Sequence, residues 1–337
     1  MPIPNPQSVV ERLKAFQASV RDVVRKSHDA GTDLHTVSRS SSADTIYKID
    51  TEVDPILEAV CEEWGRETPL VLVAEGLEGP DGHEVERRVF PHGTREEDAR
   101  IRVIVDPIDG TRGIMYDKRP AWALAGVAPN KGPGTRLRDI EVAVMTELPT
   151  SKMGRADVLW AIKGHGAQAK RVDLSTGVVA PLPIKPSQAP KIDHGFAMVA
   201  NFFPGTKVLA SELMEYLIRQ LIGEVDVKKA TVFDDQYIST GGQFYELIVG
   251  HDRFNADLRP LFYAMQGQPE GLCCHPYDCA TLLIAEEAGV ILTDGHGQPL
   301  DGPLDVTTGL NWIGYANPTL HDTIAPLLKL YLSTRAS

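Results

Sequence analysis

The spacing of apolar residues divides the N-terminal half of the chain into helical and strand-like stretches. Apolar residues recur every three or four positions across 9–24, which predicts an amphipathic helix. A second helix is expected over 51–64, closed by Gly65. Short apolar runs at 70–74 and 101–105 predict buried strands. This half of the chain should therefore combine helices with a sheet.

Further strands are expected after the second buried run. The segment 78–100 is charged and is predicted to be exposed. Four strand-like runs then follow with Gly and Pro between them, which favours an antiparallel sheet. These runs cover residues 121–127, 140–146, 158–162 and 167–172.

A group of prolines between 181 and 190 marks the predicted domain boundary. Beyond it strand-like and helical stretches alternate, which is typical of an α/β arrangement. The expected strands are 196–200, 290–293 and 312–316, and the expected helices are 207–222, 242–250, 278–288 and 318–332. We assign 252–260 a structural role. The sequence predicts an α/β (α+β) protein with domains at 1–187 and 188–337.

Composition and charge restrict the possible partners. The chain is 42% hydrophobic and 24% charged, which is typical of a globular protein. The net charge of −12 opposes binding to a nucleic acid polymer, which requires a basic face. The N-terminus has no basic region followed by an apolar one, and no stretch is long and apolar enough to span a membrane. We therefore expect a cytoplasmic protein without a membrane partner.

The four cysteines fit no C-x-x-C or disulfide framework. Three of them lie close to His275, so a zinc site is one interpretation and buried reduced thiols are the other. We favour buried thiols for Cys61, Cys273, Cys274 and Cys279.

The strand predicted at 101–105 leads into two carboxylates, Asp106 and Asp109, and then into Gly110 and Thr111. Carboxylates held together at the end of a buried strand are costly unless a cation lies between them. Hard oxygen ligands of this kind suit Mg²⁺. The amides after Gly110 would face an anion at the start of a short helix. Metal and phosphate together predict phosphoryl chemistry.

Three other carboxylates also lie where a predicted element begins or ends. Asp50 and Asp278 each begin a predicted helix, and Glu75 follows the strand at 70–74. Taken singly, Asp50 and Asp278 are explained better by helix capping than by catalysis, whereas Glu75 fits a loop residue and a functional residue equally well.

The segment Asp106-Pro-Ile-Asp-Gly-Thr111 resembles the central motif of the inositol monophosphatase family. This family belongs to the lithium-sensitive, Mg²⁺-dependent phosphatase superfamily, which includes fructose-1,6-bisphosphatases and 3′(2′),5′-bisphosphate nucleotidases. Residues 277–290 are similar to the second family motif, and 294–301 and 314–319 resemble the C-terminal pattern. The resemblance runs in order from about residue 9 to 328. It implies a layered αβαβα fold.

The resemblance implies two main metal sites. Glu75, Asp106 and the carbonyl of Ile108 would hold one Mg²⁺. Asp106, Asp109 and Asp278 would hold a second, with Asp106 as the bridge. A third, weaker ion would depend on Glu75, and Mn²⁺ could replace Mg²⁺.

Catalytic and phosphate-binding roles are implied in the same way. Thr111, hydrogen-bonded to Asp50, would orient and help deprotonate the attacking water. The amides of Gly110 and Thr111 would bind the phosphate oxygens. The implied reaction is hydrolysis of a small phosphomonoester, such as an inositol, sugar or polyol phosphate, by a lithium-sensitive enzyme that forms a homodimer.

Two alternatives stay open at this point. Arg112-Gly113 is closer to the Lys-Gly of bisphosphate nucleotidases than to the Thr-Asn of inositol monophosphatases, and Arg112 could pair with a second phosphate. A regulatory or binding protein that keeps the fold without turnover is the other alternative.

Departures from the family pattern leave the substrate undetermined. Gly76 replaces the second family Glu, and Tyr277 replaces a Trp. Glu270 is the nearest candidate for the Glu that grips a sugar hydroxyl, although it lies one residue too far from Asp278. The other candidates for substrate contact are Ser239, Gly241, Gly242, His275 and the segment 234–236.

Overall fold

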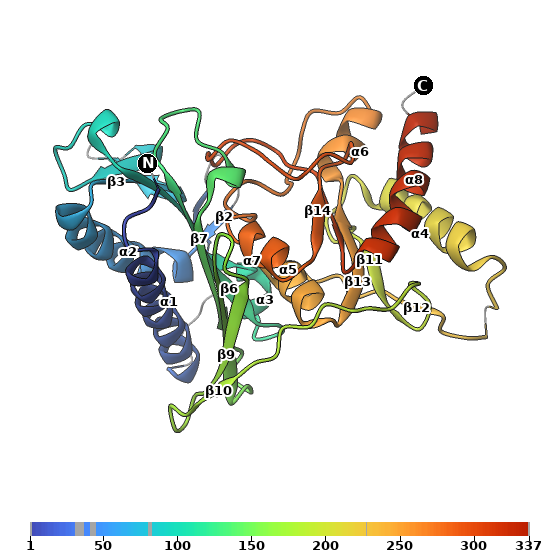
Figure 1. Ribbon diagram of the computed structural model, residues 1–337, viewed down its shortest axis with the longest axis horizontal. Helices are drawn as coiled ribbons and strands as arrows, with labels where there is room; N and C mark the ends of the chain where they lie inside the picture. Colours follow the sequence, from blue (N-terminus) through green and yellow to red (C-terminus); the bar gives the residue numbers. More distant parts are fainter. Residues whose placement is uncertain (1, 31–36, 41–44, 80–82, 227, 336–337) are drawn as a thin grey trace.

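The computed structural model describes residues 2–30, 37–40, 45–79, 83–226 and 228–335; the side chains of 37–40 and 45–52 are outside this description. Figure 1 shows alternating layers: α1 and α2, a first sheet, α5 and α7, a second sheet, and α4 with α8. The predicted layered αβαβα architecture is thus confirmed.

The outer layer consists of α1 (Pro6–Asp29) and α2 (Lys48–Glu67). The apolar face of α1 is buried, as its periodicity predicted. The boundaries predicted for α2 were wrong, because the helix begins at Lys48 and continues past Gly65. A Cβ at Gly65 would lie 2.5 Å from the carbonyl carbon of Phe90. The glycine allows close packing on a neighbouring strand rather than ending the helix.

The first sheet has the strand order β10-β9-β8-β7-β6-β5-β3-β4. All its neighbouring strands are antiparallel except β3 and β5, which are parallel. Its strands are β3 (Leu70–Glu78), β4 (Glu84–Phe90), β5 (Ile101–Asp109), β6 (Ala121–Pro129), β7 (Val142–Leu148), β8 (Arg155–Ile162), β9 (Ala167–Asp173) and β10 (Val179–Pro181). A separate hairpin pairs β1 (Val37–Ser40) with β2 (Thr45–Tyr47).

The structure corrects two predictions in this sheet. The charged segment 78–100 contains β4, an edge strand whose charged side chains conceal its alternating pattern. Glu75 does not end its strand, because β3 continues to Glu78 after an irregularity between Val73 and Leu77. Gly76 lies at this irregularity with a φ of 72°, a left-handed conformation that favours glycine.

The second sheet has the order β12-β11-β13-β15-β14. Its strands are β11 (Gly195–Val199), β12 (Val232–Phe233), β13 (Asp252–Asp257), β14 (Ile291–Thr293) and β15 (Trp312–Tyr315). The helices of this half are α4 (Lys207–Ile222), α5 (Thr240–Val249), α6 (Arg259–Met265), α7 (Leu282–Glu287) and α8 (Pro318–Arg335). Segment 252–260, for which the sequence predicts a structural role, forms β13 and the start of α6.

The middle helices join the two sheets into one core. Trp122 of β6, Phe244 of α5 and Trp312 of β15 belong to the same buried cluster. Phe244 packs edge-to-face on Trp312, with ring centroids 4.9 Å apart. Pro181 ends β10, and Pro183, Pro186 and Pro190 lie in the connection between the sheets. The division into two domains stays a prediction.

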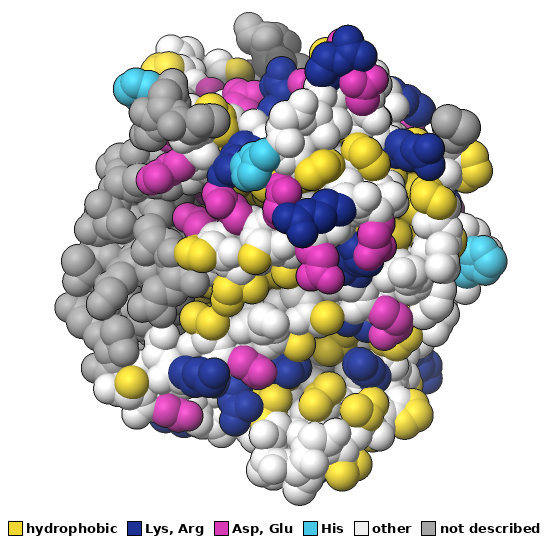
Figure 2. All heavy atoms as spheres, turned by 90° about the vertical axis from the view of Figure 1, so that its left-hand side faces the viewer, with side chains coloured by type: hydrophobic (Ala, Val, Ile, Leu, Met, Phe, Trp, Pro, Cys, Tyr) yellow, Lys and Arg dark blue, Asp and Glu magenta, His cyan; other side chains and the backbone are white. Residues whose placement is uncertain are grey.

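The outer surface carries mixed charge. Figure 2 views the molecule from the side of α1 and α2, where Lys and Arg side chains are interspersed with Asp and Glu side chains. Within the described residues, none of the helices combines the length and hydropathy needed to cross a bilayer.

Candidate active site

Three carboxylates from distant parts of the chain converge on one point. Asp106 and Asp109 lie at the end of β5, and Asp278 lies in the turn before α7. One carboxylate oxygen from each lies within 4.8 Å of the others. In the described part of the chain, they are the one group of three or more Asp, Glu, His or Cys side chains arranged closely enough to hold a metal ion.

Burial and mutual repulsion make this cluster unfavourable when all its members are charged. Burial first, and the charge of Asp278 second, raise the pKa of Asp109 to about 8. Burial likewise raises the pKa of Asp278 to about 7. The pKa of Asp106 is raised well above its ordinary value by burial and then by Asp109, Asp278 and Glu75. A cation among these oxygens would relieve the repulsion, and the all-oxygen donor set fits Mg²⁺ or Mn²⁺.

Glu75 joins the cluster because of the register between β3 and β5. The parallel pairing ends at Ala74 and Val105, so Glu75 and Asp106 are the next residues on adjacent strands. Glu75 raises the pKa of both Asp106 and Asp278, and it lines the same cavity. The bulge in β3 therefore brings a fourth carboxylate to the site.

The N-terminus of α5 holds the Asp109 carboxylate. Its Oδ2 accepts hydrogen bonds from the Ser239 hydroxyl at 2.8 Å and from the Gly241 amide at 2.6 Å. The same hydroxyl accepts from the Gly242 amide at 2.9 Å and caps the helix. A Cβ at Gly241 would lie 2.5 Å from Leu124 Cδ2 and 2.9 Å from Asp109 Oδ2. The glycine turn that we assigned to substrate contact thus contacts a proposed metal ligand.

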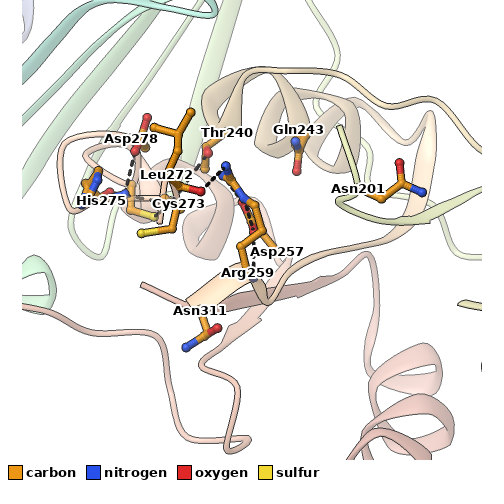
Figure 3. Close-up of polar contacts among 12 residues, drawn as sticks. Asn201, Thr240, Gln243, Asp257, Arg259, Leu272, Cys273, His275, Asp278 and Asn311 are labelled. Atoms are coloured by element: carbon orange, nitrogen blue, oxygen red, sulfur yellow. Dashed lines mark hydrogen bonds and ion pairs between the residues drawn. The ribbon is translucent and has the colours of Figure 1, made fainter. Parts of the chain in front are cut away.

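Asp278 is positioned by a turn rather than by a helix start, which corrects the prediction. Residues 276–281 form turns, and α7 begins only at Leu282. The Asp278 Oδ2 accepts from the His275 amide at 2.6 Å (Figure 3). The His275 ring lies 3.1 Å from the Thr308 carbonyl and is not among the cavity-lining residues, so His275 contacts Asp278 through its backbone.

The turn between β5 and the short helix α3 (Thr111–Met115) brings the remaining motif residues together. Gly110 precedes the helix with a φ of 96°. The Thr111 hydroxyl donates to the Ile108 carbonyl at 2.7 Å, and the Ile108 amide donates to Asp106 at 3.0 Å. Asp50 lies in α2 with its side chain outside the described residues, so its contact with Thr111 stays a prediction.

The carboxylates open into a cavity of about 110 Å³ between the two sheets. Arg259, which is only 4% exposed, lines this cavity. Its guanidinium pairs with both oxygens of Asp257 and donates to the Leu272 carbonyl at 3.0 Å (Figure 3). The nearby guanidinium also lowers the pKa of Asp278, although burial outweighs it.

Comparison with known proteins identifies the fold and its relatives. No model of a protein family matches the chain. It is 22% identical, over 284 residues, to the fructose-1,6-bisphosphatase/inositol-1-monophosphatase of Methanothermobacter thermautotrophicus, covering 84% of this chain and 82% of that protein. Leishmania major fructose-1,6-bisphosphatase in its holo form superposes with a TM-score of 0.66 at 12% identity, covering 99% of both chains. Inositol monophosphatase from Anabaena (Nostoc) gives a TM-score of 0.59 at 13% identity, covering 97% of both chains.

The chain thus has the fold of these proteins and is similar to phosphatases of the inositol monophosphatase/fructose-1,6-bisphosphatase superfamily. The segment that resembles the central motif of that superfamily is the turn that carries Asp106 and Asp109.

Several candidates for substrate contact are not among the residues that line the cavity. Glu270 is exposed, and its carboxylate lies against Gly309 and 3.7 Å from the Cys273 sulfur. Asp235 forms an ion pair with Arg119, and Gln236 hydrogen-bonds backbone groups of Val199 in β11 and of Asn201. Arg112 does line the cavity, as do Ser239 and Gly110.

The cysteines form no metal group in the described residues. All four are free and buried, as predicted for reduced thiols. The sulfurs of Cys274 and Cys279 lie 3.4 Å apart, and the neighbouring His275 ring faces a backbone carbonyl.

Sequence reasoning missed several residues of the cavity wall, among them Arg259, Phe202 and Phe203. Arg259 lies just after Asp257, the last residue of β13. Charged residues at the end of a strand were also the feature that pointed to Asp106 and Asp109. The signal was missed because β13 has no continuous apolar run. The two phenylalanines follow β11 and were indistinguishable from core residues in the sequence.

Proposed function

We propose that this chain hydrolyses a small phosphomonoester with the help of divalent cations held by Asp106, Asp109, Asp278 and Glu75. The observation that carries the proposal is the convergence of three carboxylates within 4.8 Å, with pKa values raised by burial and by one another. Such a cluster has little structural value without a cation. The similarity to proteins named as fructose-1,6-bisphosphatases and inositol monophosphatases supports the same reaction.

The protein supplies the positions of the reacting groups. Bound divalent cations lower the pKa of an attacking water and neutralise charge on the phosphate ester. Asp109 is held in place by Ser239 and the Gly241 amide. We propose that Thr111 and Asp50 orient the water and take up its proton, and that the amides of Gly110 and Thr111 bind the phosphate oxygens. We also propose two or three Mg²⁺ ions, replaceable by Mn²⁺, inhibition by Li⁺, and a homodimer.

A phosphate-release assay tests the proposal. The native chain should release phosphate from at least one member of a panel of inositol, sugar and nucleoside phosphates with Mg²⁺ or Mn²⁺. EDTA should abolish this release, and Asp109→Asn should lower it by a factor of at least about 10² because a held ligand is lost. Folded native protein that is inactive on the whole panel with both metals would contradict the proposal.

A 3′(2′),5′-bisphosphate nucleotidase is the second candidate, supported by Arg112 at the cavity wall. A guanidinium there could pair with the second phosphate of such a substrate. Turnover of adenosine 3′,5′-bisphosphate well above that of inositol phosphate, reduced in Arg112→Gln, would favour it. Equal turnover of both substrates would reject it.

A further inference from the structure

Two adjacent phenylalanines form part of the cavity wall that faces the carboxylates. Phe202 and Phe203 lie in the loop between β11 and α4, and both are half-buried. Their rings pack edge-to-face, with centroids 5.0 Å apart and planes at 89°. Large aromatic side chains are usually covered in a core, so a partly exposed pair at a charged cavity indicates a contact surface for a ligand.

Buried and half-buried cations support the two rings. The Arg259 guanidinium lies 4.9 Å from the centroid of Phe202 and 5.3 Å from that of Phe203. Its pairing with Asp257 fixes its position. The guanidinium of Arg112 lies 5.1 Å from the Phe203 centroid. These cation–π contacts restrain the rings before a ligand binds.

The loop itself is tied down on both sides of the aromatic pair. The Asn201 amide donates to Gln236 at 2.8 Å, and Gln236 in turn donates to the Val199 carbonyl at 3.0 Å. The Gly205 carbonyl accepts from Gln266 at 3.0 Å. A ligand that packs on the rings therefore meets a preorganised surface and loses little affinity to ordering the loop.

The polar groups of this wall are engaged with the protein. The Ser239 hydroxyl bonds to Asp109, and the Arg259 guanidinium bonds to Asp257 and Leu272. The Thr240 hydroxyl contacts the Cys274 sulfur at 3.7 Å. A site that selects a polyol uses polar groups to bind its hydroxyls, whereas Phe202 and Phe203 contribute carbon surface to the cavity.

We propose that Phe202 and Phe203 determine substrate specificity by stacking a planar aromatic ring, the base of a nucleoside phosphate, in the alcohol part of the ester. This inference rests on the proposed function, since it describes the substrate of the same site. Stacking of a base on an aromatic side chain contributes to binding whatever the base, because every base has a π-face. The Phe pair thus favours nucleoside phosphates over polyol phosphates.

Steady-state kinetics of ring-removing variants test the proposal. The native enzyme should have a kcat/KM for adenosine 3′- or 5′-phosphate at least about tenfold above that for inositol monophosphate. Phe203→Leu and Phe202→Leu should each raise the KM for the adenosine phosphate by about tenfold, with little change in kcat. The KM for inositol monophosphate should change less than about twofold, because that substrate has no ring to stack.

A second aromatic pair, in β11 and β12 of the second sheet, supplies the matched control. Phe196 of β11 packs edge-to-face on Phe233, with centroids 5.3 Å apart, and is 38% exposed. Neither residue lines the cavity. Phe196→Leu should leave both KM values unchanged. Equal changes for the two substrates, an equal effect of Phe196→Leu, or a native preference for inositol monophosphate would overturn the proposal.

Binding of the free nucleoside separates this inference from the proposed function. Adenosine without phosphate should bind the metal-free protein in calorimetry, and Phe203→Leu should weaken its binding by about tenfold. A chain that binds adenosine in this way but releases no phosphate would contradict the proposed function and leave the aromatic surface supported. A chain that releases phosphate but binds no adenosine would support the proposed function and contradict the aromatic stacking surface.

Discussion

The hydroxyl of Ser239 donates to the Asp109 carboxylate at 2.8 Å, although the two residues are 130 positions apart in the sequence. The same hydroxyl caps α5 by accepting from the Gly242 amide. One side chain thus fixes a helix of the middle layer and a carboxylate at the end of β5. The geometry of the carboxylate cluster therefore depends on how the layers pack.

Replacing this hydroxyl should affect stability and metal binding together. Ser239→Ala removes a helix cap, which should lower the free energy of unfolding by about 1 kcal/mol. It also removes a hydrogen bond that orients Asp109, so Mg²⁺ affinity measured by calorimetry should fall by about tenfold or more.

Asn5 provides the control for Ser239. Its side chain also caps a helix, α1, but this helix lies in the outer layer and contributes no residue to the carboxylate cluster. Asn5→Ala should destabilise the protein without changing Mg²⁺ affinity. Native Mg²⁺ affinity in Ser239→Ala would show that the hydroxyl does not position Asp109.

Neutralising one member of the cluster should stabilise the metal-free protein. The pKa of Asp106 is raised in the folded chain, so the ionised Asp106 carboxylate lowers the free energy of unfolding at high pH. Asp106→Asn should therefore match or exceed the native melting temperature in EDTA at pH 8. It should also lose the rise in melting temperature that Mg²⁺ gives the native protein.

Asp173 allows a comparison with an exposed turn, where the carboxylate accepts hydrogen bonds from Ser175 and Thr176. Asp173→Asn should keep the shift that Mg²⁺ produces. A large loss of stability in metal-free Asp106→Asn, or a full Mg²⁺ shift in that variant, would disprove the role of Asp106.

The sequence predicted the parts of the site that follow from local pattern. The apolar run before Asp106 predicted a strand end, and the residues after it resembled a known motif. The convergence of Asp278 with Asp109 could be expected only from that resemblance, because the register between distant elements has no local signal. The contacts of Ser239 with Asp109 were not predicted, since they depend on the packing of α5 against β5. The strand β4 was missed because its edge position permits charged side chains.

A buried carboxyl outside the site should make stability depend on pH. Burial raises the pKa of Glu147 from 4.5 to about 8, with the nearby Asp157 as the second cause. Between pH 4.5 and about pH 8, Glu147 keeps its proton in the folded chain but has lost it in the unfolded chain. The free energy of unfolding therefore falls as the pH rises. Glu147→Gln keeps an acceptor for the Asp157 amide, which donates to Glu147 at 3.0 Å, and removes the titration.

The comparison of native protein and Glu147→Gln is made by urea unfolding at several pH values. The variant should gain stability relative to the native protein from pH 5 to pH 8, by at most about 1.4 kcal/mol per pH unit. Parallel stability curves for the two proteins over this range would mean that Glu147 does not titrate there.

The most direct test of metal binding by the carboxylate cluster is anomalous diffraction from crystals grown with Mn²⁺. We expect a manganese peak bounded by carboxylate oxygens of Asp106, Asp109 and Asp278, and the absence of that peak in Asp106→Asn. The crystals should be grown at a Mn²⁺ concentration that saturates metal-dependent phosphatases. If the three side chains are then ordered and no manganese lies between them, the result contradicts the proposed active site.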